Sequence, residues 1–326
     1  LGDVYKRQGQ KPPFFFKMAF LEYDPRQLNC YEKLKEPAVD IPTTDDIAWA
    51  YFKEDCWVYN KLQVVLSQNV PGGPIGVTPS KYPIVIKPIY NMFGGGIEAR
   101  KINSSEELEK YKHPGCMWME WVGGIHYSHD IMVVKGLPVW IVSFKGHSLG
   151  KGMFDYWEVD TPSDLIIHYI YNWIETRLPN YTGCVCLETI TDITPVIIEV
   201  HLRMGDIDRL GNYNLMYSII GLYENQVWEF KDQIDKFYLF AIWGESGVKY
   251  KICLKKVKEL CKNLVSYQID RPELYYQNPI GGIRLAILNG YDKKECIRVR
   301  NEIIPYFSPQ IPDYLRKKIT SSNTTC

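Results

Sequence analysis

The sequence has no excess of charge of either sign. Its 326 residues include 38 Lys and Arg and 38 Asp and Glu, so the formal net charge at pH 7 is zero. A chain that binds nucleic acid through phosphate contacts usually presents a basic surface. The composition therefore argues against a nucleic-acid partner, and there is no acidic tail.

Long apolar runs are also missing. No stretch approaches the roughly 20 apolar residues that a membrane-spanning helix needs, and no secretory pattern is present. The nine cysteines, an odd number, contain no Cys-x-x-Cys pair. Cys184 and Cys186 would share one face of a strand only because side chains alternate. These features predict a cytoplasmic protein with reduced thiols and no membrane partner.

Two common phosphate-binding motifs are absent. No Gly-Lys-Ser/Thr opens a helix, which excludes a P-loop. Segment 82–88 is a short apolar strand that carries Lys87, and Gly94, Gly95 and Gly96 follow it after five intervening residues. A protein kinase would place its glycine loop before the lysine strand. The glycine amides can wrap a phosphate beside a lysine charge, although three glycines also form ordinary flexible turns.

Two glutamates lie in apolar, β-branched segments. Glu188 ends segment 182–188 and Glu199 lies within 196–203, and the polar residues 189–194 predict the connecting loop. On adjacent strands the two carboxylates would face one point. Desolvating them without a partner costs several kcal/mol, so the pattern predicts a cation: Mg²⁺ or Mn²⁺, or the guanidinium of Arg203. The alternative is a pair of exposed glutamates on a hairpin.

Between the glycine segment and the two glutamates lies Met119-Glu-Trp-Val-Gly-Gly-Ile-His-Tyr-Ser-His-Asp130. In this order, the motifs resemble those of the ATP-grasp superfamily. The resemblance covers about residues 60–209 and is closest to carboxylate-amine or carboxylate-thiol ligases, with carboxylase-like features. It implies an α+β ATP-grasp fold, in which two α+β lobes clamp ATP, and the cofactors ATP and Mg²⁺ or Mn²⁺.

The resemblance also implies roles for the phosphate-binding residues. Lys61, in Tyr59-Asn-Lys-Leu, matches the lysine that opens the first helix of the nucleotide-binding lobe. Lys87 matches the second phosphate-contacting lysine. In Glu199-Val-His-Leu-Arg203, the arginine matches the residue that contacts the transferring phosphoryl group or the acyl-phosphate intermediate, where a forked cation is suitable.

The hinge between the lobes supplies the remaining nucleotide contacts. By its register, the Met119 carbonyl and the Val122 amide would hold the adenine edge, and Glu120 belongs to the same nucleotide-binding group. His126 takes the place of the ribose-binding glutamate, a position at which biotin-carboxylase-like members also carry histidine.

The chain departs from the family pattern at His201, where an asparagine normally helps to ligate the second magnesium. Magnesium prefers oxygen ligands, whereas imidazole suits softer metals. Three interpretations stay open: His201 donates to a phosphate oxygen, it ligates Mn²⁺ or Mg²⁺ together with Glu188 and Glu199, or it is structural.

The domain organisation follows from the same pattern. Residues 1–17 are interpreted as a non-native leader, because residues 3–8 match a translated sequencing adaptor. Residues 18–60 form a short N-terminal segment, in which Thr44 or Asp45 caps a helix. Residues 61–125 form the small lobe, 126–235 the large lobe with the metal site, and 236–326 a small β-rich domain and tail. This last domain is expected to close the active site or to serve in a homodimer.

A glycine-rich segment over residues 145–157 lies between apolar segments. Related ligases place a loop here that closes over the nucleotide or acceptor. Lys151 is its expected catalytic contact, with Asp155 and Tyr156 as further candidates. The alternative is an exposed loop with incidental charges.

Two functions are compatible with these residues. The first is an ADP-forming ligase that activates a small-molecule carboxylate as an acyl phosphate, which an amine or thiol then attacks. The second is a nucleotide-binding regulatory or structural module that kept the fold without turnover. The first is the leading hypothesis, and the substitution by His201 and the short N-terminal segment are the support for the second. ATP hydrolysis stimulated by a metabolite would distinguish them.

Overall fold

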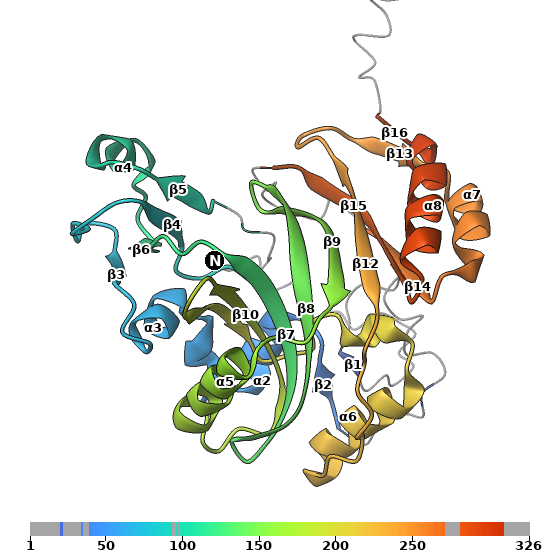
Figure 1. The fold of residues 1–326 in the computed structure, drawn as a ribbon, viewed down its shortest axis with the longest axis horizontal. Coiled ribbons are helices and arrows are strands. Elements are labelled where there is room, and N and C mark those ends of the chain that lie inside the picture. The colour runs from blue at the N-terminus through green and yellow to red at the C-terminus, as the bar shows by residue number, and fades with distance from the viewer. Residues whose placement is uncertain are drawn as a thin grey trace, which may run out of the picture.

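The computed structural model describes residues 20–21, 34, 39–92, 96, 98–270 and 281–309. The leader predicted over residues 1–17 lies outside this part of the chain, as do Gly94 and Gly95. Two larger sheets carry the structure, and Figure 1 shows the smaller one to the left of the larger one. The predicted α+β class is confirmed.

The smaller sheet has four antiparallel strands in the order β3-β6-β4-β5. They are β3 (Gly72–Pro74), β4 (Ile84–Pro88), β5 (Arg100–Ile102) and β6 (Cys116–Glu120). Helix α3 (Lys61–Leu66) precedes them, and α4 (Ser105–Tyr111) connects β5 to β6. Because side chains alternate along β4, Ile84 and Ile86 pack into the core of this sheet, while Val85 packs on the other face against residues that include Ile198.

The larger sheet has eight antiparallel strands in the order β11-β10-β7-β8-β9-β12-β15-β14. In chain order they are β7 (Ile125–Val134), β8 (Leu137–Gly150), β9 (Met153–Val159), β10 (Gly183–Thr191), β11 (Pro195–His201), β12 (Tyr238–Gly244), β14 (Ser266–Ile269) and β15 (Ile283–Gly290). The turn between β7 and β8 has φ angles of 48° at Lys135 and 79° at Gly136, as a two-residue hairpin loop requires. Strands from both sides of residue 236 belong to this one sheet. The domain boundary expected at residue 236 stays a prediction.

Successive side chains of β7, β10 and β11 point to opposite faces of the sheet, so the two faces at this end differ in character. One face is apolar and packs against α5 (Asp164–Arg177) through side chains that include Ile131, Val185 and Leu187. The opposite face carries polar side chains and lines a cleft. The chemistry of the site is therefore separated from the core by the thickness of one sheet.

Further helices cover the remaining apolar surface. Helix α6 (Tyr213–Asn225) packs with one core cluster, and α7 (Leu254–Leu260) and α8 (Lys293–Ile303) pack with the β12 and β15 end of the sheet. The N-terminal segment contributes β1 (Phe20–Leu21), β2 (Ile41–Pro42) and α2 (Asp45–Tyr51), and β13 (Tyr250–Ile252) pairs with β16 (Phe307–Pro309).

Within the part of the chain that the structure describes, no helix combines the length and apolar character needed to cross a membrane. The cysteines of the same part are free thiols, namely Cys56, Cys116, Cys184, Cys186, Cys253, Cys261 and Cys296.

His129 is a polar residue in the apolar face beneath the site. Its Nδ1 lies 2.8 Å from Ser143 Oγ and its Nε2 lies 3.0 Å from Thr189 Oγ1. Burial, with a smaller effect of the His126 charge, lowers the pKa of His129 from 6.5 to about 3. The ring is therefore neutral in the folded protein at neutral pH.

We predict that His129 makes the folded state sensitive to acid. The unfolded chain takes up a proton near pH 6.5 and the folded chain only near pH 3, so stability that is fully present above pH 6.5 is lost as the pH falls toward 3. His129→Gln should flatten the fall in the free energy of unfolding over this range, measured by urea denaturation. The matched control is His113→Gln at an exposed position, which should leave the slope unchanged. An unchanged slope in His129→Gln would contradict the prediction.

Candidate functional site

A cleft of about 1090 Å³ lies between the two larger sheets and reaches the β12 and β15 strands. Its size is near the upper end of the range for small-molecule sites. Most of the predicted site residues line it: Lys61, Lys87, Gly96, Met119, Val122, His126, Lys151, Glu188, Glu199, His201 and Arg203. The structure thus brings together residues that lie more than a hundred positions apart in the sequence.

The two glutamates face each other from adjacent strands, as the sequence predicts. Glu188 on β10 is the direct partner of Glu199 on β11, and the register shifts by one residue immediately after this pair. The shift leaves Ile198 of β11 as the extra residue of a β-bulge, whose backbone groups fall out of the ladder. Its carbonyl accepts a hydrogen bond from Lys87 Nζ at 2.8 Å. The bulge therefore fixes both the pair of carboxylates and the lysine beside it.

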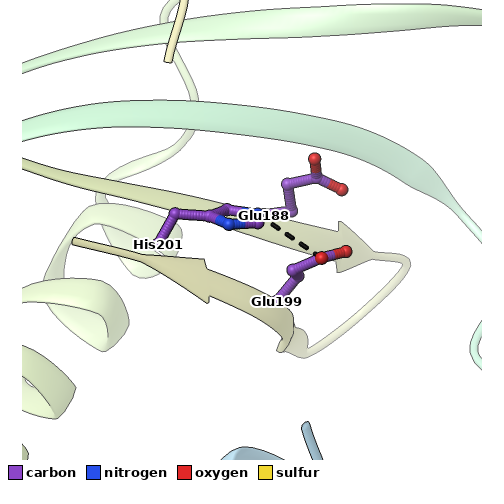
Figure 2. Close-up of side chains that lie close together, drawn as sticks. All are labelled: Glu188, Glu199 and His201. Carbon is purple, nitrogen blue, oxygen red and sulfur yellow. Dashed lines mark ion pairs between the residues drawn. The ribbon is translucent and has the colours of Figure 1, made fainter. Parts of the chain in front are cut away.

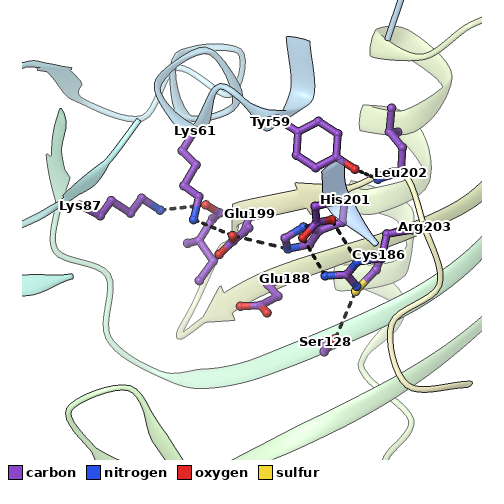
Figure 3. A network of polar contacts seen from close by, with 12 residues as sticks. Tyr59, Lys61, Lys87, Ser128, Cys186, Glu188, Glu199, His201, Leu202 and Arg203 are labelled. Carbon is purple, nitrogen blue, oxygen red and sulfur yellow. Dashed lines mark hydrogen bonds and ion pairs between the residues drawn. The ribbon is translucent and has the colours of Figure 1, made fainter. Parts of the chain in front are cut away.

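Two lysines from the smaller lobe approach this pair, as Figure 3 shows. Lys61 is the first residue of α3, whose N-cap Asn60 accepts from Gln63 N, and its Nζ lies 2.5 Å from Glu199 Oε1. Burial of Lys87, together with the charge of Lys61, lowers the pKa of Lys87 from 10.5 to about 8. Both ammonium groups therefore lie at one wall of the cleft.

His126 lies beside the other carboxylate. Its Nε2 is 2.9 Å from Glu188 Oε2, and its ring meets the rings of Phe154 and Trp157 edge to face. Burial alone would raise the pKa of Glu188, but the hydrogen bond and charge of His126 outweigh it and lower that pKa. The histidine expected at the ribose thus contacts a predicted metal ligand.

Asp45 links the N-terminal segment to the signature residues of β11. The N-cap of α2 is Thr44 and not Asp45, although the Thr44 side chain makes no capping hydrogen bond. The Asp45 side chain is 5% exposed and accepts from His201 Nδ1 at 2.9 Å and from Arg203 Nε at 3.0 Å. Arg203 Nη2 adds a second bond to Asp45 Oδ2 at 3.2 Å. Burial would raise the pKa of Asp45, but the charges of Arg203 and His201 hold it well below its usual range.

This contact was not foreseen from the sequence. Asp45 and His201 are 156 residues apart, and neither the spacing nor the composition of segment 41–52 indicates that the acidic group turns away from its own helix. Arg203 also binds Asp45, through Nε and Nη2, and its expected contact with a transferring group stays a prediction.

The hinge strand leaves backbone groups available beside the cleft. Glu120 N donates to Pro71 O and Trp121 N donates to Pro83 O. In an antiparallel ladder, the N–H of Pro71 would in turn donate to the Glu120 carbonyl and that of Pro83 to the Trp121 carbonyl, but proline has no N–H. Within the described residues, the neighbouring strands therefore offer no backbone donor to these two carbonyls. Met119 instead lies in register with Val85, two residues along, where the ladder forms its next pair of bonds.

The turn between β8 and β9 meets both neighbouring parts of the chain. Lys151 lies at its centre with φ 53°. A Cβ atom on Gly281 would lie 2.7 Å from the Lys151 carbonyl, and one on Gly96 would lie 3.8 Å from Gly152 Cα. Asp155 and Tyr156 do not line the cleft: Asp155 pairs with Arg300 and Tyr156 accepts from Lys293. Of the candidate contacts in segment 145–157, Lys151 alone lines the cleft.

The far end of the cleft is built by residues that the sequence did not single out or left without a role. Arg209 pairs with Asp206 at 2.6 Å, and Arg284 on β15 pairs with Asp270 at 2.7 Å. Trp243 on β12 also lines this end. No motif marks Trp243 or Arg284, because their strands reach the cleft only through the pairing of β12 with β9.

Asp130 positions the loop at this end. Its carboxylate accepts from Gly205 N at 2.5 Å and from Asp206 N at 3.0 Å. Burial raises the pKa of Asp130 to about 7, against the effect of the Gly205 hydrogen bond. A Cβ on Gly205 would lie 2.8 Å from both carboxylate oxygens, so the close approach requires glycine.

Comparisons with known proteins were made for sequence and for structure. No family model matches the sequence, and no curated protein matches it. The structure is similar to L-amino acid ligase from Bacillus licheniformis over 79% of this chain and 72% of that chain, with a TM-score of 0.57 and 15% identity.

Two further solved structures are similar at comparable levels. For carboxyaminoimidazole ribonucleotide synthase from Aspergillus clavatus, complexed with ATP, the coverage is 77% of this chain and 75% of that chain, with a TM-score of 0.53 and 13% identity. For biotin carboxylase from Campylobacter jejuni, the coverage is 83% of this chain and 75% of that chain, with a TM-score of 0.51 and 12% identity.

All three are ATP-grasp enzymes. At these identities the likeness concerns the fold and not the substrates. It agrees with the α+β architecture and the eight-stranded antiparallel sheet described above. The chain has the ATP-grasp fold.

Proposed function

We propose that this protein is an ATP-dependent ligase that activates a carboxylate as an acyl phosphate and releases ADP. The observation that carries the proposal is the convergence of Lys61 and Lys87 from one lobe on Glu188 and Glu199 of the other. Two cations facing two carboxylates across a cleft suit a polyphosphate and the divalent metal that accompanies it.

The donor set fits such a metal. Figure 2 shows Glu188, Glu199 and His201 close together, with His201 facing Glu199, and the ligand atoms of the three residues lie within 4.8 Å of one another. Glu188 and Glu199 would hold the ion by carboxylate oxygens. When bound, a divalent ion there offsets phosphate charge during transfer.

The lobes supply the remaining nucleotide contacts. Lys61 and Lys87 would bind the β and γ phosphates. The Glu120 carbonyl and the Val122 amide fit the adenine edge better than the Met119 carbonyl, because the ladder offers Glu120 no donor while Met119 is in register with Val85. The apolar side chains of Val85, Met119 and Ile190 line the cleft nearby.

The acceptor end suits an anionic substrate. Arg209 and Arg284 lie there with Trp243, and Lys151 lies on the turn that meets the small lobe. A carboxylate oxygen attacks the γ phosphorus, the bond to the β,γ-bridging oxygen breaks, and ADP leaves. An amine or thiol then attacks the acyl carbon and phosphate leaves. Arg203, held by Asp45, contributes a fixed positive charge at the wall of the cleft.

A second candidate is a nucleotide-binding module without turnover. Its support is specific: Asp45 occupies the fork of Arg203, and His201 stands in the place of an oxygen ligand. Such a module would bind ATP and release no product.

The first prediction for this function concerns the products. With a suitable carboxylate and amine, ATP should yield ADP and phosphate, and hydroxylamine should trap the acyl phosphate as a hydroxamate. Chromatography of the spent nucleotide measures the outcome. AMP and pyrophosphate would contradict the mechanism, because they require attack at the α phosphorus. Tight ATP binding without any product over a broad panel of carboxylates would favour the module.

The second prediction concerns the charged residues of the cleft. Lys87→Met and Glu188→Gln should each lower kcat/KM for ATP roughly 30- to 1,000-fold, which corresponds to a rise of about 2 to 4 kcal/mol in the activation free energy. The reason is that each variant removes a charge that acts on phosphate or metal. Lys258→Met, at an exposed position on α7, is the matched control and should retain full activity. Circular dichroism would verify folding. Wild-type turnover in both cleft variants would remove the site assignment.

A further inference from the structure

The His201 ring is held in one orientation by Asp45. Nδ1 lies 2.9 Å from Asp45 Oδ1, and the side chains of both residues are 5% exposed. Arg203 donates to both oxygens of the same carboxylate. A carboxylate that receives two charge-assisted bonds from arginine stays ionised and can only accept, so His201 Nδ1 must carry the proton that it donates.

This leaves the other ring nitrogen facing the glutamates. His201 Nε2 lies 3.5 Å from Glu199 Oε1, and Figure 2 shows this contact between β11 side chains. A carboxylate that binds Nδ1–H of a histidine fixes the tautomer and makes Nε2 the ligand atom in metal sites, where it also raises the basicity of the ligand.

The distance fits shared coordination. Two ligand atoms each about 2.1 Å from one ion and 3.5 Å apart subtend an angle of about 110°. Two such atoms can be at most about 4.2 Å apart. The ligand atoms of the three residues lie within 4.8 Å of one another, so small side-chain movements would complete the set. Lys61 would leave Glu199 for a phosphate, since its ammonium lies 2.5 Å from Glu199 Oε1.

We propose that His201 Nε2 is a metal ligand beside Glu188 and Glu199, and that Asp45 is the positioning residue that commits it to this role. Imidazole suits transition-metal ions better than Mg²⁺, with affinity rising from Mn²⁺ to Co²⁺. We therefore expect this site to prefer a transition-metal ion, whereas a site with oxygen ligands alone accepts Mg²⁺. The inference rests on the metal-assisted function proposed above and specifies the class of metal.

The experiment uses Mn²⁺ as the probe on the full chain without nucleotide. Electron paramagnetic resonance measures free Mn²⁺ and gives the Kd, and Mg²⁺ is titrated as a competitor. Asp45→Asn and His201→Asn should each raise the Kd for Mn²⁺ about 10- to 100-fold, with a smaller change for Mg²⁺ in His201→Asn. The control is His147→Asn, which breaks a similar pair with Glu158 at 2.7 Å away from the cleft lining and should leave the Kd unchanged.

A spectroscopic readout covers the case in which Asp45→Asn does not fold. Electron spin echo modulation of the wild-type Mn²⁺ complex should show a directly bound imidazole nitrogen, and His201→Asn should lose it. Mn²⁺ bound without nitrogen modulation, or an unchanged preference for Mn²⁺ over Mg²⁺ in His201→Asn, would overturn the inference. Nitrogen modulation in a protein that forms no ADP would support the His201 metal site and count against the ligase function. ADP formation with Mg²⁺ and no nitrogen signal would support the ligase function and count against the His201 metal site.

Discussion

The two carboxylates that face each other across β10 and β11 impose the requirement that the rest of the cleft meets. Like charges at paired positions of a sheet repel, and both lie where water is largely removed. The structure places two lysines of the smaller lobe, Lys61 and Lys87, beside this pair, and the His126 ring of β7 contacts Glu188. The small lobe is thus held to the large lobe by the charges that a metal and a polyphosphate would otherwise supply.

The bulge at Ile198 makes this arrangement possible. Without the extra residue, the alternation along β11 would turn the residues on one side of Glu199 to the opposite face. With it, Val196 and Ile198 pack with the small lobe, Ile197 joins the core under α5, and Glu199 and His201 face the cleft. One backbone irregularity therefore serves packing and chemistry together.

Asp45 gives the N-terminal segment a part in the site. By binding His201 and Arg203 at once, it couples two side chains of the segment that follows Glu199. A buried charge network of this kind is costly unless every member is satisfied. The loss of Asp45 would leave Arg203 buried without its counter-ion, so the residue contributes to stability as well as to the orientation of His201.

The sequence by itself determined the order of the motifs, the α+β class and the placement of Glu188 opposite Glu199, because these depend on local periodicity and on residues close in the chain. Only the tertiary structure decided the partners of the charged groups. The pairing of Asp45 with His201, the contact of His126 with Glu188, and the wall made by Trp243 and Arg284 join segments whose approach no local pattern encodes. Such contacts follow from how strands order themselves in the sheet, and from the need of each desolvated charge for whichever counter-ion the fold brings near.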